Sequence, residues 1–160
     1  MYKVLFICTG NSCRSPMAEI WFNKILKDSN ITNIVSSSAG IYACDYTSAS
    51  TQAQEVARTL GLNLRFPHFF SRSISQTLVD QSSIIVCMEH YHMKYIINKF
   101  KNAYKKTITL NDRDIPDPSG KSTYEYMETL SLMKIDLESL KQSLIYNIEL
   151  KKNKEYSTFF

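Results

Sequence analysis

Residues 4–16 read VLFICTGNSCRSP, and their pattern predicts a strand, a loop and the start of a helix. Its apolar beginning, from Lys3 to Cys8, has the continuous hydrophobic character of a strand that is buried on both faces of a parallel sheet. The polar, glycine-containing middle predicts a tight loop. Ser15 then predicts a helix N-cap, and Pro16 predicts the first helical residue. A buried strand, a short loop and a helix in this order begin an α/β unit.

The rest of the chain repeats this alternation of strand and helix. Further strands are predicted at 31–37, 83–88 and 107–110. Further helices are predicted at 51–60, with Gly61 as C-cap, and at 89–100. Two more helices are predicted to start at capping boxes, a short one at Ser73 and Gln76 and a long last one at Ser122 and Glu125. Four alternations predict a single α/β domain, a four-stranded parallel sheet with helices on both faces. We expect this domain to span 1–150 and residues 151–160 to form a flexible tail.

Composition limits the class of protein. The chain has 160 residues, of which 44% are hydrophobic and 21% charged, the balance of a soluble globular protein. Its net charge of +4 is spread along the chain and does not indicate nucleic-acid binding. No apolar run approaches the roughly 18 residues of a membrane span, and the first apolar run is too short for a signal peptide. We therefore expect a cytoplasmic protein without a membrane partner, in which the four cysteines are reduced thiols.

The loop after the first strand has the residues of an anion site. Gly10 and Asn11 tolerate left-handed backbone angles, so successive N–H groups can turn inward. The next helix adds unpaired N–H groups and the positive end of its dipole. Arg14 offers a planar guanidinium to two phosphate oxygens, and the positive field favours the thiolate of Cys8, which is the nucleophilic form. Ser15 can either cap the helix or donate its hydroxyl to that thiolate. The residues predicted to bind phosphate are Thr9, Gly10, Asn11, Ser12, Cys13, Arg14 and Ser15.

A candidate general acid lies in the loop 111–121. Protonation of the leaving group speeds its displacement from phosphorus, and the same carboxylate can then activate water. Asp117 stands between Pro116 and Pro118, which stiffen its backbone, so we predict Asp117 as the acid. Asp114 is the alternative.

These residues resemble the low-molecular-weight protein tyrosine phosphatases. The matching motifs are C-x5-R-S from Cys8 to Ser15, Ser38-Ala39-Gly40, Ser71-Arg72, Cys87-Met88-Glu89 and Asp117-Pro118. The resemblance implies a metal-free, cofactor-free, two-step hydrolysis through a cysteinyl-phosphate, with Cys8 as nucleophile, Arg14 as phosphate clamp and Asp117 as acid. It further implies that Asn11, Ser15 and Ser38 tie the loop in shape, and that Cys13 pairs reversibly with Cys8 on oxidation. We expect a phosphorylated protein as partner and a monomer or weak homodimer.

Two departures from the family pattern leave the substrate open. Tyrosine-specific members carry aromatic residues after Asp-Pro, where this chain has Ser119-Gly120, and an apolar residue in place of Ser12. The hydroxyl at position 12 resembles the protein arginine phosphatases of the same family. We nevertheless expect phosphotyrosine to be preferred, with Tyr42 or Tyr46 as the wall for its ring.

Two further expectations concern other residues. Thioredoxin-coupled arsenate reductases share the loop sequence, but they need two more cysteines after the third strand. Cys87 takes the first of these places and no cysteine follows it, so this function is disfavoured. The three histidines, His68, His90 and His92, show no ligand or triad spacing and are expected to be structural or surface residues.

Overall fold

The computed structural model describes residues 1–65 and 67–157, with the backbone alone for 151–157. The strands are β1 (Tyr2–Cys8), β2 (Ile34–Gly40), β3 (Ile84–Cys87) and β4 (Thr107–Thr109). The helices are α1 (Arg14–Asp28), α2 (Thr51–Thr59), α3 (Gln76–Gln81), α4 (His90–Lys99), the short 3-10 helix η1 (Tyr104–Lys106) and α5 (Thr123–Ser157).

The sheet is parallel throughout, with strand order β2-β1-β3-β4. β1 is flanked by β2 on one side and β3 on the other, with Cys8 opposite Gly40 and Ile7 opposite Cys87. Strand order therefore reverses at β1, and the loop after Cys8 leaves the sheet between the carboxyl ends of its two neighbours. This crevice is where open α/β sheets bind ligands, as the sequence predicts.

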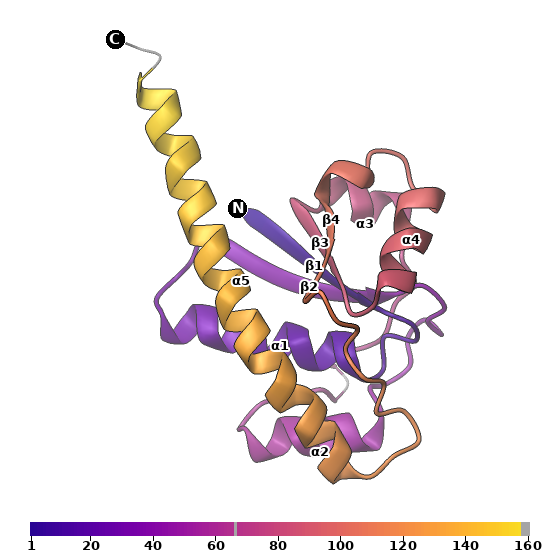
Figure 1. The fold of residues 1–160 in the computed structure, drawn as a ribbon. Coiled ribbons are helices and arrows are strands. Elements are labelled where there is room, and N and C mark those ends of the chain that lie inside the picture. The colour runs from indigo at the N-terminus through magenta and orange to yellow at the C-terminus, as the bar shows by residue number, and fades with distance from the viewer. Residues whose placement is uncertain (66, 158–160) are drawn as a thin grey trace.

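Helices cover both faces of the sheet, which confirms the predicted architecture (Figure 1). Val4 and Phe6 of β1 belong to a buried cluster with residues of α1, α2 and α5. Leu5 and Ile7, which point to the opposite face, pack in a second cluster with residues of α3 and α4. Each fully buried side chain of this size contributes roughly 1.5–3 kcal/mol to folding, so β1 is anchored from both sides.

The second strand starts at Ile34, three positions later than predicted, because the end of α1 uses the intervening residues. Asn30 has a positive φ of 56°, and the N–H of Ile31 donates to the Leu26 carbonyl at 2.9 Å. This is a left-handed helix ending that satisfies the last carbonyls of α1. Ile31 therefore belongs to the helix end and not to the strand.

The prediction of Ser15 as N-cap is wrong. Cys13 occupies the N-cap position and makes no side-chain cap hydrogen bond, so α1 begins at Arg14. The Ser15 hydroxyl is engaged with the loop instead. Pro16 is the third helical residue, still within the first turn, where its missing N–H would have no partner.

The remaining helix boundaries follow the predictions closely, except at the start of α3 and at the end of α5. α2 ends before Gly61, whose φ is +69°. The predicted capping box of Ser73 and Gln76 is wrong, because Ser75 caps α3 through the Leu78 N–H. Ser122 precedes α5, and the Glu125 carboxylate accepts hydrogen bonds from its N–H and hydroxyl. The segment 151–160, expected as a tail, is helical to Ser157, and residues 158–160 lie outside the described residues.

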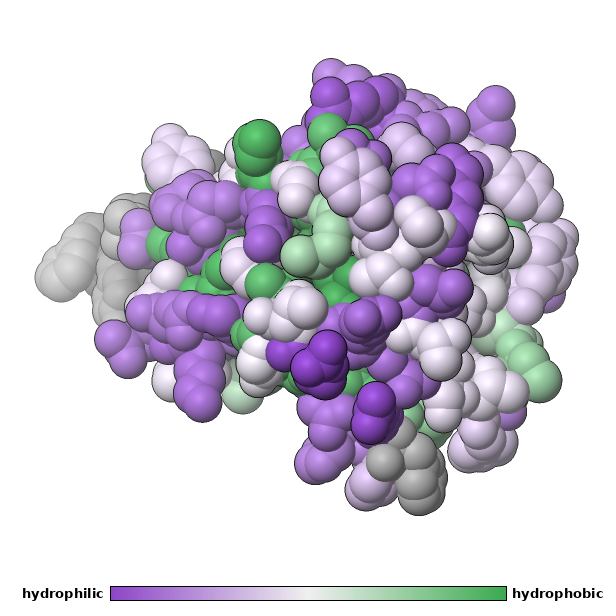
Figure 2. Space-filling model, turned by 90° about the horizontal axis from the view of Figure 1, so that it is seen from below, coloured by the Kyte–Doolittle hydropathy of each residue, from purple (hydrophilic) through white to green (hydrophobic). Residues whose placement is uncertain are grey.

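Polar residues dominate the face seen from below in Figure 2, with apolar residues showing in small areas between them. Scattered apolar groups of this kind are normal on a protein surface. No helix within the described ranges is both long and apolar enough to cross a membrane.

Candidate active site

The loop 9–13 is held by the side chain of Asn11. Asn11 has a positive φ of 52° and is fully buried. Its amide nitrogen donates to Ser15 Oγ at 2.9 Å and to Ser38 Oγ at 2.8 Å, and its oxygen accepts from the Arg72 backbone N–H at 3.0 Å. Both amide hydrogens and the oxygen thus have partners, and these hydrogen bonds offset the energetic cost of the left-handed backbone at Asn11. Gly10, which was predicted to allow a left-handed backbone, does not have a positive φ.

Ser15 directs its hydroxyl at the candidate nucleophile. Cys8 is 3% exposed, and its Sγ lies 3.0 Å from Ser15 Oγ. Ser15 Oγ accepts a hydrogen bond from Asn11, and its own hydrogen can be donated to the sulfur or to the Ala39 carbonyl, which is 3.5 Å away. Of the two places considered for the Ser15 hydroxyl, the helix cap and the side of Cys8, the structure contains the second.

Arg14 joins three separate segments of the chain. It is 2% exposed; its two terminal nitrogens bind the Glu89 carboxylate, the Ile115 carbonyl at 2.9 Å and Asp117 Oδ2 at 2.8 Å. Its Nε is buried and has no partner among the described residues. A buried donor without a partner is costly, and a phosphate oxygen in the loop would satisfy it.

The two candidate acids occupy different places. Asp117 is half exposed, binds Arg14, and accepts the Ser119 N–H through its other oxygen at 3.1 Å. Asp114 faces the start of α4, where it accepts from the His90 N–H at 2.8 Å and contacts His90 Nδ1 at 2.9 Å. The backbone hydrogen bond from His90 is the main reason that the pKa of Asp114 is lowered, which keeps it ionised. The structure therefore brings Asp117 to Arg14 and leaves Asp114 at the helix end.

Two further residues of the site escaped the sequence analysis. Glu89 follows β3 and binds Arg14. His92, in the first turn of α4, is completely buried, and its Nε2 lies 2.9 Å from Thr9 Oγ1 and 3.8 Å from Glu89. Burial lowers the pKa of His92 to about 4, so the ring is neutral at neutral pH. The position of Glu89 at the carboxyl end of a strand next to β1 was the available signal; His92 had none, because Thr9 is 83 positions away.

No group of three or more His, Cys, Asp or Glu side chains is arranged to hold a metal ion within the described ranges.

Comparison with known proteins agrees with this geometry. Residues 3–154 match the family model described as low molecular weight phosphotyrosine protein phosphatase. The chain belongs to this family. Its members are hydrolytic phosphatases, and the chain is one of them.

The relatives of this phosphatase include enzymes named for two substrates. A protein-arginine-phosphatase of Geobacillus stearothermophilus is 32% identical over 125 residues, which are 74% of this chain and 80% of the relative. A low molecular weight protein-tyrosine-phosphatase of Acinetobacter johnsonii is 33% identical over 119 residues, covering 72% and 79% respectively. The crystal structure of a low molecular weight protein tyrosine phosphatase from T. tengcongensis matches with a TM-score of 0.84 at 26% identity, over 89% of this chain and 99% of that one.

Aromatic side chains border one side of the phosphatase loop. The Tyr42 N–H donates to the Thr9 carbonyl at 2.9 Å, which places Tyr42 beside the loop. Its ring is 60% exposed and packs edge-on against Tyr95, and its hydroxyl lies 3.2 Å from that of Tyr91. Tyr46, the other candidate wall residue, stacks on Phe70 instead. The structure thus pairs Tyr42 with two tyrosines that the sequence analysis did not single out.

The other cysteines of the phosphatase differ in environment. Cys13 is buried, with its sulfur 3.1 Å from the Tyr126 hydroxyl and 3.6 Å from Ser50 Oγ. Cys87 is completely buried in the sheet, and burial raises the pKa of its thiol. A thiol of that kind is a poor shuttle for a disulfide, which adds to the argument against an arsenate reductase.

Proposed function

We propose that this phosphatase hydrolyses phosphotyrosine in proteins through a cysteinyl-phosphate on Cys8. The Cys8 thiolate attacks phosphorus, the bond from phosphorus to the phenolic oxygen breaks, and Asp117 gives its proton to that oxygen. Water then attacks the cysteinyl-phosphate, Asp117 takes back a proton, and inorganic phosphate leaves while the thiolate is restored. Arg14 and the loop N–H groups hold the phosphoryl oxygens.

The observation that carries the proposal is the chain of hydrogen bonds that ends on Cys8. Asn11 donates to Ser15 and Ser15 in turn can donate to the sulfur, in a loop whose arginine binds the candidate acid. The test is Cys8→Ser. We expect turnover to vanish while vanadate still binds, because the anion site consists of backbone N–H groups and Arg14. Activity within about tenfold of the parent would remove Cys8 from the mechanism.

The aromatic border supports phosphotyrosine as the substrate. The exposed ring of Tyr42 offers a flat apolar contact to a phenyl ester beside the loop. Ser12, next to Cys13 in the loop, has no methyl group that would narrow the site against a ring.

Phosphoarginine is the second candidate, favoured by groups that accept hydrogen bonds at the site. Glu89 is 26% and Asp117 45% exposed, and the Ser12 hydroxyl is partly exposed. A guanidinium leaving group needs such acceptors. The two substrates are to be compared by kcat/KM on peptides that carry either group. A preference of about tenfold or more for phosphoarginine would replace phosphotyrosine, and Ser12→Ile should raise phosphotyrosine turnover and depress that of phosphoarginine.

We also propose that oxidation joins Cys8 to Cys13 reversibly. Cys13 must then leave its contact with Tyr126. Mass spectrometry after mild peroxide treatment tests this: a Cys8 sulfinic acid with free Cys13 would contradict a protective disulfide.

A further inference from the structure

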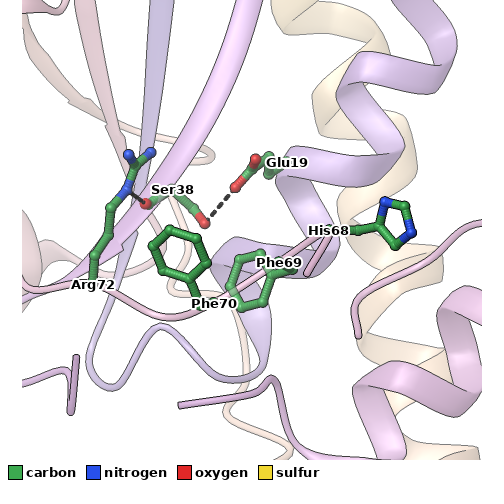
Figure 3. Close-up of a pocket in the computed structure, with 6 residues that line it drawn as sticks. All are labelled: Glu19, Ser38, His68, Phe69, Phe70 and Arg72. Carbon is green, nitrogen blue, oxygen red and sulfur yellow. Dashed lines mark hydrogen bonds between the residues drawn. The ribbon is translucent and has the colours of Figure 1, made fainter. Parts of the chain in front are cut away.

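A small pocket adjoins the phosphatase loop on the side of Ser38 (Figure 3). Its volume is about 140 Å³, and its lining residues are Glu19, Ser38, His68, Phe69, Phe70 and Arg72. A cavity of about 150 Å³ is large enough to hold a benzene molecule. The pocket, called here the Glu19 pocket, therefore has room for one small ligand or for the end group of a larger one.

The Glu19 pocket is connected to the nucleophile by hydrogen bonds. Ser38 Oγ donates to Glu19 Oε2 at 2.6 Å and accepts from the Asn11 amide at 2.8 Å. The same amide donates to Ser15 at 2.9 Å, and Ser15 Oγ is 3.0 Å from Cys8 Sγ. Because the Glu19 carboxylate only accepts, it fixes the direction of the Ser38 hydroxyl and thereby leaves Ser38 free to accept from Asn11.

Glu19 itself lacks a cation. It forms no ion pair with a described residue, and the hydrogen bonds to its carboxylate come from Ser38. Burial raises its pKa, which the hydrogen bond from Ser38 and the charge of Arg72 offset only in part. The Arg72 Nε donates to the Ser38 carbonyl at 2.8 Å, so this guanidinium is engaged on the far side of Ser38.

The other wall of the pocket is aromatic. Figure 3 shows Arg72 and Glu19 on opposite sides of Ser38, with the rings of Phe69 and Phe70 close to both Ser38 and Glu19. Phe70 is 42% exposed and stacks on Tyr46 with ring centroids 5.7 Å apart. A carboxylate beside aromatic rings suits a flat cation. Such a cation can form an ion pair with the carboxylate and a cation–π contact with the ring faces.

We propose that the Glu19 pocket binds a small planar organic cation of the guanidinium or amidinium class, and that its occupation slows the reaction at Cys8. A cation on Oε1 draws the carboxylate away from the short bond with Ser38. Ser38 then holds Asn11 less firmly, and the loop loses the order that Asn11 imposes on Ser15. The effect on rate rests on the proposed function, whereas binding to the pocket does not.

Binding is tested with benzamidine, and benzamide, its neutral counterpart of the same shape, is the control. Both are titrated into the full chain, with amide NMR signals as readout. We expect benzamidine to shift the signals of Ser38, Phe69, Phe70 and Arg72 saturably, also when phosphate fills the loop, and benzamide to bind about tenfold more weakly. Equal binding of the two compounds, or displacement of benzamidine by phosphate, would overturn the site.

Variants separate the pocket from the loop. Phe70→Ala should weaken benzamidine severalfold and leave the basal rate unchanged, because the Phe70 ring stacks on Tyr46 and is not one of the groups that hold Asn11 or Ser15. Tyr104→Ala, at a 76% exposed tyrosine outside the pocket, is the matched control. Glu19→Gln should abolish the preference for benzamidine over benzamide; an unchanged preference would contradict the role of Glu19.

The coupling is tested by the rate with an activated aryl phosphate. We expect saturating benzamidine to lower kcat with little change in KM, and Phe70→Ala to shift this inhibition to higher concentration. Binding without any change in kcat would overturn the coupling. If the NMR shifts appear and the chain hydrolyses no phosphate ester, the proposed function fails and the binding site stands.

Discussion

At the scale of single residues, the candidate site is a set of hydrogen bonds centred on Asn11. The Asn11 oxygen must face the Arg72 N–H, so its nitrogen must face Ser15 and Ser38. Ser15 Oγ, held in this way, lies 3.0 Å from Cys8 Sγ. One amide thus fixes the position of the hydroxyl beside the nucleophile, although it does not touch the sulfur itself.

Asp117→Asn should separate substrates by their leaving groups. A poor leaving group needs the proton of a general acid, so hydrolysis of an alkyl or unactivated phenyl phosphate should slow by roughly 10²–10⁴-fold. An activated aryl phosphate should be affected much less. The measurement is kcat/KM across a series of leaving groups.

Asp114→Asn is the control for Asp117→Asn. Its carboxylate is engaged with His90 at the start of α4 and does not reach Arg14. We expect Asp114→Asn to lower kcat/KM only slightly, and by the same factor for every leaving group in the series. If Asp114→Asn shows the dependence on leaving group and Asp117→Asn does not, the acid is Asp114.

Thr9→Val and His92→Phe should have the same effect on the rate. Each removes a partner of the same 2.9 Å hydrogen bond, so each is expected to lower kcat/KM by about fivefold, and the double variant should be no worse than either single one. Melting temperatures of the four proteins distinguish this from general destabilisation. Effects on kcat/KM that multiply in the double variant would show that the two residues act independently.

At the scale of elements, the loop follows β1 and lies between the carboxyl ends of β2 and β3. Gly40 ends β2 opposite Cys8. A Cβ on Gly40 would lie 2.6 Å from the Thr9 carbonyl oxygen and 2.8 Å from the Asn11 nitrogen, both of them backbone atoms. Glycine is therefore required here by the close approach of two backbones.

Gly40→Ala should displace the loop and lower kcat/KM by roughly 10²-fold, the cost of a misplacement of about 1 Å. Gly61→Ala is the matched control: it has a positive φ of 69° and open space around it, so it should cost about 1 kcal/mol of stability without loss of activity. Urea unfolding and steady-state kinetics on both variants provide the comparison. Full activity in Gly40→Ala would contradict the requirement for glycine at this close approach.

The elements were predictable to the extent that local signals define them. Strand–helix alternation and the C-x5-R loop predicted the sheet and placed Cys8 and Arg14, because both depend on nearby residues. Helix ends were predicted less well where a polar side chain had two possible partners: the Ser15 hydroxyl binds the loop rather than capping α1. Glu89, His92 and Tyr126 were missed because each contacts the loop across 75 or more positions of sequence, which no local spacing reveals.

At the scale of the whole molecule, His92 makes stability depend on pH. Burial lowers its pKa from 6.5 to about 4, with the carboxylate of Glu89 opposing the shift and Arg14 adding to it. Between these two values the unfolded chain binds a proton that the folded chain does not. The contribution of neutral His92 is therefore complete above about pH 6.5 and is lost as the pH falls toward 4, by up to about 3 kcal/mol.

His92→Asn should flatten this dependence. We expect the free energy of unfolding of the parent, measured in urea, to fall more steeply than that of the variant between about pH 6.5 and 4. His68→Asn, at an exposed histidine, should follow the parent. If the free energy of unfolding of parent and His92→Asn changed in parallel with pH, His92 would be excluded as the source of the pH dependence.

The three partners of Arg14 have a consequence for synthesis of the chain. Ile115 and Asp117 follow Arg14 by 101 and 103 positions, so they leave the ribosome after it. Domains fold as units during synthesis, and the contacts of Arg14 span most of this one. The nascent chain therefore carries its cysteine long before it can hold the arginine in place. The ability to attack phosphate esters should consequently arise only after Asp117 has been synthesised and lies against Arg14.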